Sequence, residues 1–232
     1  WIQQLCGADV SAFAGQGSPL AQHTTMLRTS HRFDEASGIG ALASAANDGD
    51  ASRCARIWSA GHDDLHRLAA DANQLARLAV EGYGSYLKAL QQQRPDRPDD
   101  VDQWCRNVLH QLSQFQLLCA LRQGPLGLQS LNEKIAHALC QAGLLERSDG
   151  WYEGRPVMVT RNDYQTGLMN GDVGVTLAMP QEDGSRRLRV VFQLADGGLK
   201  RILPSRLDQV ETTFAMTVHK SQGSEFDHAA LV

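Results

Sequence analysis

The sequence predicts an α/β fold in which a small β-barrel is inserted between two pieces of an α/β domain, and three observations carry this prediction. A compact apolar run over 115–121 leads through a Gly/Pro turn into an amphipathic helix over 128–139, the pattern of a buried strand that feeds a helix. Between 150 and 211, about five short β-like runs alternate with hairpin-turn signals. An apolar strand over 212–218 then ends in a polar turn, which indicates a return to the α/β domain.

The composition excludes two classes of protein. The chain has 232 residues, 42% of them apolar, and a formal net charge of -4 at neutral pH. This apolar content can offset chain entropy, so disorder is excluded as the dominant state. No stretch approaches the ~18 uninterrupted apolar residues of a membrane span, and we expect neither a membrane partner nor a signal peptide. Because the chain begins with Trp1 rather than Met, we expect a fragment or a processed product.

The cysteines predict buried thiols in a reducing, cytoplasmic environment. Their number is odd, their spacings are wide, and no C-x-x-C pair occurs, so a disulfide framework is not indicated. The five positions are Cys6, Cys54, Cys105, Cys119 and Cys140.

Residues from about 41 to 143 are predicted to be mainly helical. Over 71–90, apolar side chains recur every three or four residues and form one stripe. The charged, Pro-rich segment 94–100 predicts a loop. The helical pattern then resumes over 101–112, with Asp99 or Asp100 expected as its N-cap.

The predicted barrel is built from short strands joined by tight turns. The β-like runs are 157–160, 173–177, 188–194 and 199–203. The turns between them carry Asn170-Gly171, Asp183-Gly184 and Asp196-Gly197.

The barrel also carries a concentration of positive charge. The segment from 186 to 206 contains six basic residues and a single acidic one, Asp196. A solvated sheet face is one interpretation, and local attraction of phosphate is the other. The six are Arg186, Arg187, Arg189, Lys200, Arg201 and Arg206.

The segment 217–227 concentrates groups suited to phosphate and ribose. A predicted buried strand delivers His, Lys, Ser and Gln side chains into a turn, at the kind of strand end where α/β sheets bind ligands. Lys220 and the backbone N–H groups of Gln222 and Gly223 suit phosphate. Glu225 is able to accept hydrogen bonds from ribose hydroxyls.

This segment resembles motif V of superfamily 1 helicases, in the form found in the 5′→3′ branch. The run 27–33 resembles motif IV, and 118–132 resembles the strand–helix unit that follows it. The runs 150–158 and 161–174 resemble the SH3-like barrel that is inserted into the second motor domain of these helicases.

The resemblance implies a fold and its boundaries. The chain would be the RecA-like second motor domain of a P-loop helicase, in part, with an inserted SH3-like barrel. Residues 1–149 would form the first part of the RecA-like domain and 150–211 the barrel. Residues 212–232 would return to the RecA-like domain and stop before motif VI.

The resemblance also implies roles for particular residues. Arg32 would be an arginine finger, and Gln222 would sense the γ-phosphate. Gly223 and Glu225 would face the nucleotide. The single-stranded DNA contacts would come from Thr217, His219, Lys220 and Ser221 of motif V and from Asn162, Tyr164 and Asn170 of the barrel, with Tyr164 as a stacking surface. No metal site is expected, because His62 and His66 lack a third ligand at a supporting spacing.

The implied cofactors are ATP and Mg²⁺ in the full-length protein, with none expected on this chain. It has neither a G-x-x-x-x-G-K-[ST] loop nor an acidic pair to hold Mg²⁺, so we expect no ATP hydrolysis from the chain alone. The implied partners are single-stranded and duplex-end DNA and two further subunits of a complex for recombinational repair of double-strand breaks.

Two alternatives stay open at this point. One is a stand-alone helicase of the same branch, or a conjugative relaxase-helicase. The other belongs to a different class: an SH3-like binding module whose α/β part has no motor activity.

Overall fold

The computed structural model describes residues 37–68, 71–92, 94–97 and 100–232, together with residues 7, 9, 11 and 15. The chain divides into two units, residues 1–68 and residues 69–232. None of the helices that can be described has both the length and the apolar character needed to cross a bilayer.

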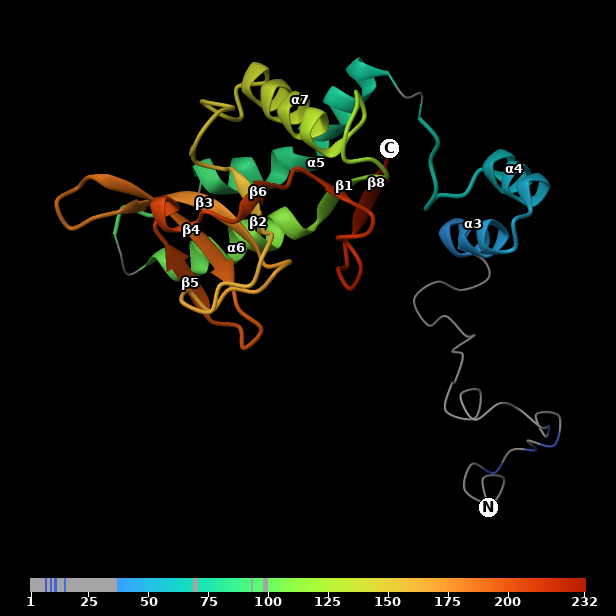
Figure 1. Cartoon of the computed structure of the whole chain (residues 1–232). Helices are drawn as coiled ribbons and strands as arrows, with labels where there is room; N and C mark the ends of the chain where they lie inside the picture. Colours follow the sequence, from blue (N-terminus) through green and yellow to red (C-terminus); the bar gives the residue numbers. More distant parts are fainter. Residues whose placement is uncertain are drawn as a thin grey trace. The chain divides into compact units, whose positions relative to one another are not determined.

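The described part of the first unit is a pair of helices, α3 (Gly38–Asn47) and α4 (Ala51–Ala60), which pack side by side (Figure 1). The N-terminus of α3 is capped twice. The Ser37 hydroxyl accepts from the Gly40 N–H at 3.1 Å, and the Asp64 carboxylate accepts from the Gly38 N–H at 3.0 Å. At α4, Asp50 accepts from the Arg53 N–H at 2.8 Å.

The second unit begins with two long helices, α5 (Ala72–Gln92) and α6 (Val101–Ser113). The apolar stripe predicted over 71–90 is confirmed, because Tyr83, Tyr86 and Leu87 are almost fully buried in the main core. Asp100 occupies the N-cap position of α6, but its side chain makes no capping hydrogen bond. The N-cap predicted at Asp99 or Asp100 is therefore confirmed at Asp100 as a position, while the backbone, which is not extended there, leaves the carboxylate without a capping hydrogen bond.

A three-stranded parallel sheet follows. Strand β1 (Phe115–Cys119) lies in the middle, with β7 (Ala215–Thr217) and β8 (His228–Leu231) on either side. The helix α7 (Leu128–Gln141) comes directly after β1 and packs into the main core. The predicted strand–helix unit and the predicted return strand are thereby confirmed.

The second sheet is antiparallel and has five strands in the order β5-β4-β3-β2-β6. The predicted turns are formed with positive φ at Gly171, Gly184 and Gly197, which suits glycine. The strand bounds are β2 (Pro156–Val159), β3 (Val173–Pro180), β4 (Arg186–Gln193), β5 (Leu199–Ile202) and β6 (Val210–Thr212), with a 3₁₀ turn at Pro204–Arg206.

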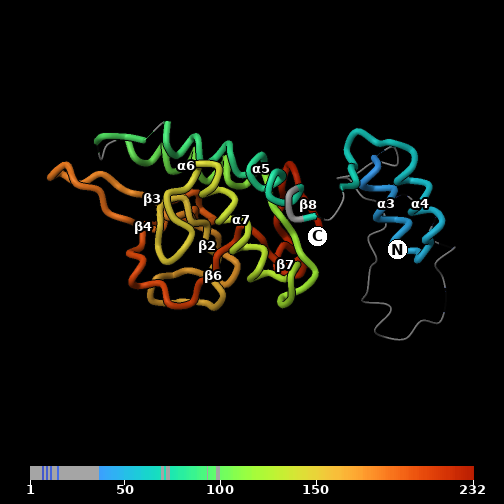
Figure 2. The backbone as a smooth tube through the Cα atoms, turned by 90° about the horizontal axis from the view of Figure 1, so that it is seen from above, coloured from blue at the N-terminus to red at the C-terminus, as the bar shows by residue number. Residues whose placement is uncertain are grey.

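The two faces of the antiparallel sheet belong to different cores. Val175, Leu177 and Val191 pack into the main core with the helices, whereas Val190 and Phe192 pack into a second, smaller core. Alternate residues of a strand point to opposite faces, so β4 contributes to both cores. In Figure 2, α5 and α6 run along one side of this unit, and the turn between β3 and β4 projects beyond it.

The four described cysteines are buried or half-buried. Cys105 and Cys119 are buried, and Cys54 and Cys140 are half-buried; these four are free thiols. Cys6 lies outside the described residues.

Candidate nucleic-acid interface

The candidate site begins at the carboxyl edge of the parallel sheet. Strand β7 ends at Thr217, and the Val218 N–H continues its pairing with β1 by donating to the Cys119 carbonyl at 3.1 Å. The turn that follows, residues 218–224, therefore starts beside the end of the central strand. This is the edge at which α/β sheets present their loops to ligands.

The turn is held by its own backbone. The Lys220 N–H donates to the Thr217 carbonyl at 2.9 Å, and the Ser221 hydroxyl donates to the Val218 carbonyl at 2.9 Å. Gly223 has a φ of 88°, a conformation that strains any residue with a Cβ. The turn therefore has a defined, hydrogen-bonded conformation.

The predicted motif V residues differ in their access to solvent. Thr217 is buried at 7% exposure, so its side chain lies within the fold. The other side chains are open to solvent, fully or in part: His219, Lys220, Ser221, Gln222 and Glu225.

A buried polar network fixes the strand that carries this turn. The Asn132 side chain of α7 accepts from the Ala215 N–H at 2.9 Å and donates to the Ala215 carbonyl at 3.0 Å. Its amide thus pairs with β7 as a neighbouring strand would. Next to β7, the Tyr83 hydroxyl of α5 donates to the Phe214 carbonyl and accepts from the Leu117 N–H at 3.2 Å.

The second part of the candidate site is the β2–β3 connection, residues 160–172, which we call the hairpin loop. Within it, the Thr166 hydroxyl donates to Asp163 at 2.8 Å and holds the pKa of that carboxyl below its ordinary value, with help from the Thr166 and Gln165 N–H groups. Asp163 therefore serves the turn. Tyr164 projects from the same turn and is 81% exposed, the most exposed large apolar side chain among the described residues.

The two parts meet through one side-chain contact. The Lys220 ammonium donates to the Asn170 Oδ1 at 2.7 Å, and the Asn170 N–H donates to the Asn162 Oδ1 at 2.9 Å. The helicase resemblance implies DNA contacts for these three residues, and the structure joins them in space although Asn170 and Lys220 are 50 positions apart in the sequence. Tyr164 lies in the same hairpin loop.

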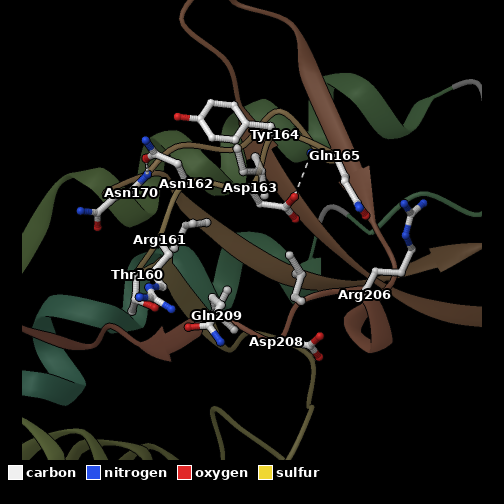
Figure 3. A pocket seen from close by; sticks show the side chains of 14 residues that line it. Thr160, Arg161, Asn162, Asp163, Tyr164, Gln165, Asn170, Arg206, Asp208 and Gln209 are labelled. Atoms are coloured by element: carbon white, nitrogen blue, oxygen red, sulfur yellow. Dashed lines mark hydrogen bonds between the residues drawn. The ribbon is translucent and has the colours of Figure 1, made fainter.

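An open pocket of about 830 Å³ lies along the hairpin loop. Figure 3 shows Tyr164 and Gln165 on one side of it, with Asp208 and Gln209 across from them. Its lining also includes Arg161 and Arg206. The pocket therefore offers two guanidinium groups, several amides and one exposed aromatic ring.

The basic stripe is only partly available to ligands. Arg186 donates to the Pro95 carbonyl at 2.9 Å and to Asp96 at 3.3 Å, and Arg201 donates to Asp102. These two arginines connect the antiparallel sheet to Pro95 and Asp96 and to the first turn of α6 at Asp102. Of the six basic residues, Arg206 alone lines the described pocket.

Two further features that the sequence singles out are the motif IV arginine and the His62/His66 pair. Arg32 and the rest of 27–33 lie outside the described residues. In the described part of the chain, no group of three or more potential metal ligands is gathered. Between His62 and His66, Asp64 caps α3 instead.

The chain is similar over most of its length to the RecBCD enzyme subunit RecD of several bacteria. It is 33% identical to RecD of Haemophilus influenzae over 228 residues, which are 93% of this chain and 34% of that protein. It shares 37% identity with RecD of Mycolicibacterium smegmatis over 206 residues, 89% of this chain and 34% of the relative. A shorter match, 35% identical over 116 residues, joins 48% of the chain to 15% of the ATP-dependent RecD2 DNA helicase of Deinococcus radiodurans. No protein-family model matches the chain.

Solved structures give a weaker likeness. The chain aligns with Bacteroides Pif1 helicase in complex with ADP-AlF3 and single-stranded DNA at 14% identity and a TM-score of 0.31, covering 71% of this chain and 43% of that one.

The chain is a homologue of RecD and spans about a third of the RecD proteins that it matches. RecD is also the protein to which the motifs of the sequence point most closely, and that prediction is confirmed.

Proposed function

From this homology to about a third of RecD, we propose that the chain forms the second motor domain of an ATP-dependent 5′→3′ DNA helicase subunit. The subunit would act with RecB and RecC as exodeoxyribonuclease V in double-strand-break repair and homologous recombination. Two features support the proposal. The sequence carries the motif V pattern, and the turn with that pattern lies at the carboxyl edge of a parallel sheet.

The proposed domain organisation is RecA-like for 1–149 and 212–232, with an SH3-like barrel for 150–211. The strands support it, because β1, β7 and β8 pair in parallel while the strands between 156 and 212 form a separate antiparallel sheet. The small second core on one face of that sheet is what a curled barrel requires.

We propose that this chain supplies one part of a composite ATP site. ATP and Mg²⁺ supply the phosphoryl-transfer chemistry when bound, and the phosphate loop would come from a part of the protein outside this sequence. In this chain, Arg32 would stabilise charge on the transferring phosphoryl group, and Gln222 would sense the γ-phosphate. Gly223 and Glu225 would face the nucleotide.

The proposed DNA surface combines the turn at residues 218–224, which we call the motif V turn, with the hairpin loop. One observation carries it: the Lys220–Asn170 contact at 2.7 Å makes a cationic turn and a loop with an exposed aromatic ring into one continuous surface. Cations that track phosphates and aromatic rings that stack on bases are the two features of single-strand binding. His219 and Ser221 lie on the same turn.

A related candidate is a stand-alone helicase. The 35% identity to RecD2 over 48% of the chain favours it as the second choice. Co-purification of the full-length protein with RecB and RecC distinguishes the two.

Binding of labelled oligo-dT to the chain, followed by fluorescence anisotropy over a range of salt concentrations, tests the proposed DNA surface. We expect weak binding. The logarithm of the association constant should fall linearly with the logarithm of the salt concentration, with a slope of about 0.7 per neutralised phosphate. Binding that does not depend on salt, or no binding at all, would contradict the surface and favour a protein-binding module.

A further inference from the structure

Resting on the proposed function, we propose that Asn170 is a positioning residue: it holds the Lys220 ammonium in place for a DNA phosphate and makes no essential DNA contact of its own. The inference changes the role that the sequence resemblance implies for Asn170. It also makes the hairpin loop and the motif V turn a single phosphate-binding unit rather than two separate grips.

The first argument is the hydrogen bonding of Asn170. Its Oδ1 accepts from Lys220 Nζ at 2.7 Å, and its backbone N–H donates to the Asn162 Oδ1 at 2.9 Å. The side-chain oxygen and the backbone donor are therefore both engaged within the protein. The Asn162 side chain holds the backbone of Asn170, and Asn170 in turn holds Lys220.

The second argument is the charge of the acceptor. Lys220 makes no ion pair in the part of the chain that the structure describes, and its contact at Asn170 is to a neutral amide. A carboxylate at this place would cancel the positive charge. An amide oxygen orients the ammonium and leaves its charge and two of its three N–H donors for an anion.

The third argument is entropy. A lysine side chain has four rotatable carbon–carbon bonds and loses considerable rotamer freedom when it is fixed on a phosphate. Lys220 is half-buried, and its ammonium is held by a residue from another loop. Part of the ordering cost is therefore met before DNA binds, which is the basis of preorganisation.

The salt dependence of oligo-dT binding by the 232-residue chain tests the proposal, because Asn170→Ala changes no charge. If Asn170 positions Lys220, Lys220→Ala lowers the salt slope by about 0.7, the contribution of one phosphate on a single strand. Asn170→Ala lowers the slope in the same direction but by less, because an ammonium that is no longer held occupies the phosphate position only part of the time. We expect affinity to fall about tenfold for Lys220→Ala and somewhat less for Asn170→Ala. The double variant should bind no more weakly than Lys220→Ala alone.

Other outcomes overturn the proposal in recognisable ways. A slope that Asn170→Ala leaves unchanged, with losses that multiply in the double variant, would mean that Asn170 contacts DNA independently. A slope left unchanged together with a lower melting temperature would mean a structural role only. Ala fits the backbone here, since Asn170 has no positive φ and Gly171 supplies that conformation at 101°.

A matched control variant completes the experiment. Lys88→Ala removes an exposed lysine on α5, within the same unit, and should leave the slope unchanged. If the wild-type chain itself shows no salt-dependent binding, the proposed function fails. If only the Asn170→Ala slope disagrees, this inference fails by itself.

Discussion

Asn132 illustrates how a single side chain fixes the strand that carries the candidate interface. Its amide exchanges two hydrogen bonds with the backbone of Ala215 and donates a third to the Leu128 carbonyl in its own helix at 3.0 Å. A buried asparagine so placed cannot be replaced by an apolar residue without leaving the N–H and C=O groups of Ala215 without these partners. Polar satisfaction, and not packing alone, therefore sets where the motif V turn begins.

Glu153 is the residue whose ionisation should affect stability. Its carboxylate accepts from the Ala178 N–H at 3.0 Å and from Arg94. Burial nevertheless raises its pKa above the ordinary value of 4.5, because desolvation outweighs the Ala178 hydrogen bond and the attraction of Arg94 and Arg186. The folded protein therefore binds the proton more tightly than the unfolded chain does.

The sign of the pH effect follows from this difference. Stability from Glu153 is fully present below the unfolded pKa and is lost as pH rises through the raised folded pKa. We expect Glu153→Gln to gain stability relative to wild type between pH 4.5 and neutrality, measured as the free energy of unfolding in urea. A difference that stays constant over this interval would contradict the assignment.

At the scale of elements, the sequence predicts what depends on local pattern. The stripe over 71–90 identified α5, and the Asn-Gly and Asp-Gly pairs identified the turns of the antiparallel sheet. The sequence also placed the N-cap of α6 at Asp99 or Asp100, but the missing hydrogen bond of the Asp100 side chain was not predictable, since it depends on the backbone angles of Asp100. Side-chain contacts between distant elements could not be predicted either. Nothing in the sequence pairs Lys220 with Asn170, or Arg201 with Asp102.

The contact between α5 and β1 yields a test at this scale. A Cβ on Gly82 would clash with the Phe115 ring, whereas one on Gly84, two residues along α5, would come no closer than 4.0 Å to Leu144. Alanine is the better helix former by about 1 kcal/mol. We therefore expect Gly84→Ala to stabilise the protein by up to about 1 kcal/mol, and Gly82→Ala to destabilise it by about 1–3 kcal/mol through overpacking.

Urea-induced unfolding of the two variants measures both effects under the same conditions. Each substitution makes the same chemical change in the same helix, so the comparison isolates the clash with Phe115. If Gly82→Ala proves as stable as Gly84→Ala, α5 does not approach β1 as closely as the structure has it.

At the scale of the whole molecule, the distribution of charge matters more than its sum. The net charge of -4 suggests no affinity for nucleic acid. Internal pairing occupies Arg186 and Arg201, while Lys220 faces a neutral amide and Arg206 lines a pocket. Motif resemblance therefore supplied the candidate residues, but the fold was needed to separate the arginines that pair inside the protein from Lys220 and Arg206.

The last prediction concerns the proposed helicase subunit, since this chain spans about a third of the RecD proteins that it matches. Arg32 lies outside the described residues, so its role as an arginine finger depends on the motif IV resemblance. In the full-length protein, we expect Arg32→Ala to leave ATP binding nearly unchanged and to lower DNA-stimulated ATP turnover by about 10³-fold or more, because such an arginine stabilises charge that develops only in the transition state. Arg28→Ala, four positions earlier in the same run, is the matched control and should retain most of the turnover. Equal turnover in wild type and Arg32→Ala would remove the finger from this chain, whereas a parallel loss of ATP affinity would make Arg32 a ground-state nucleotide contact.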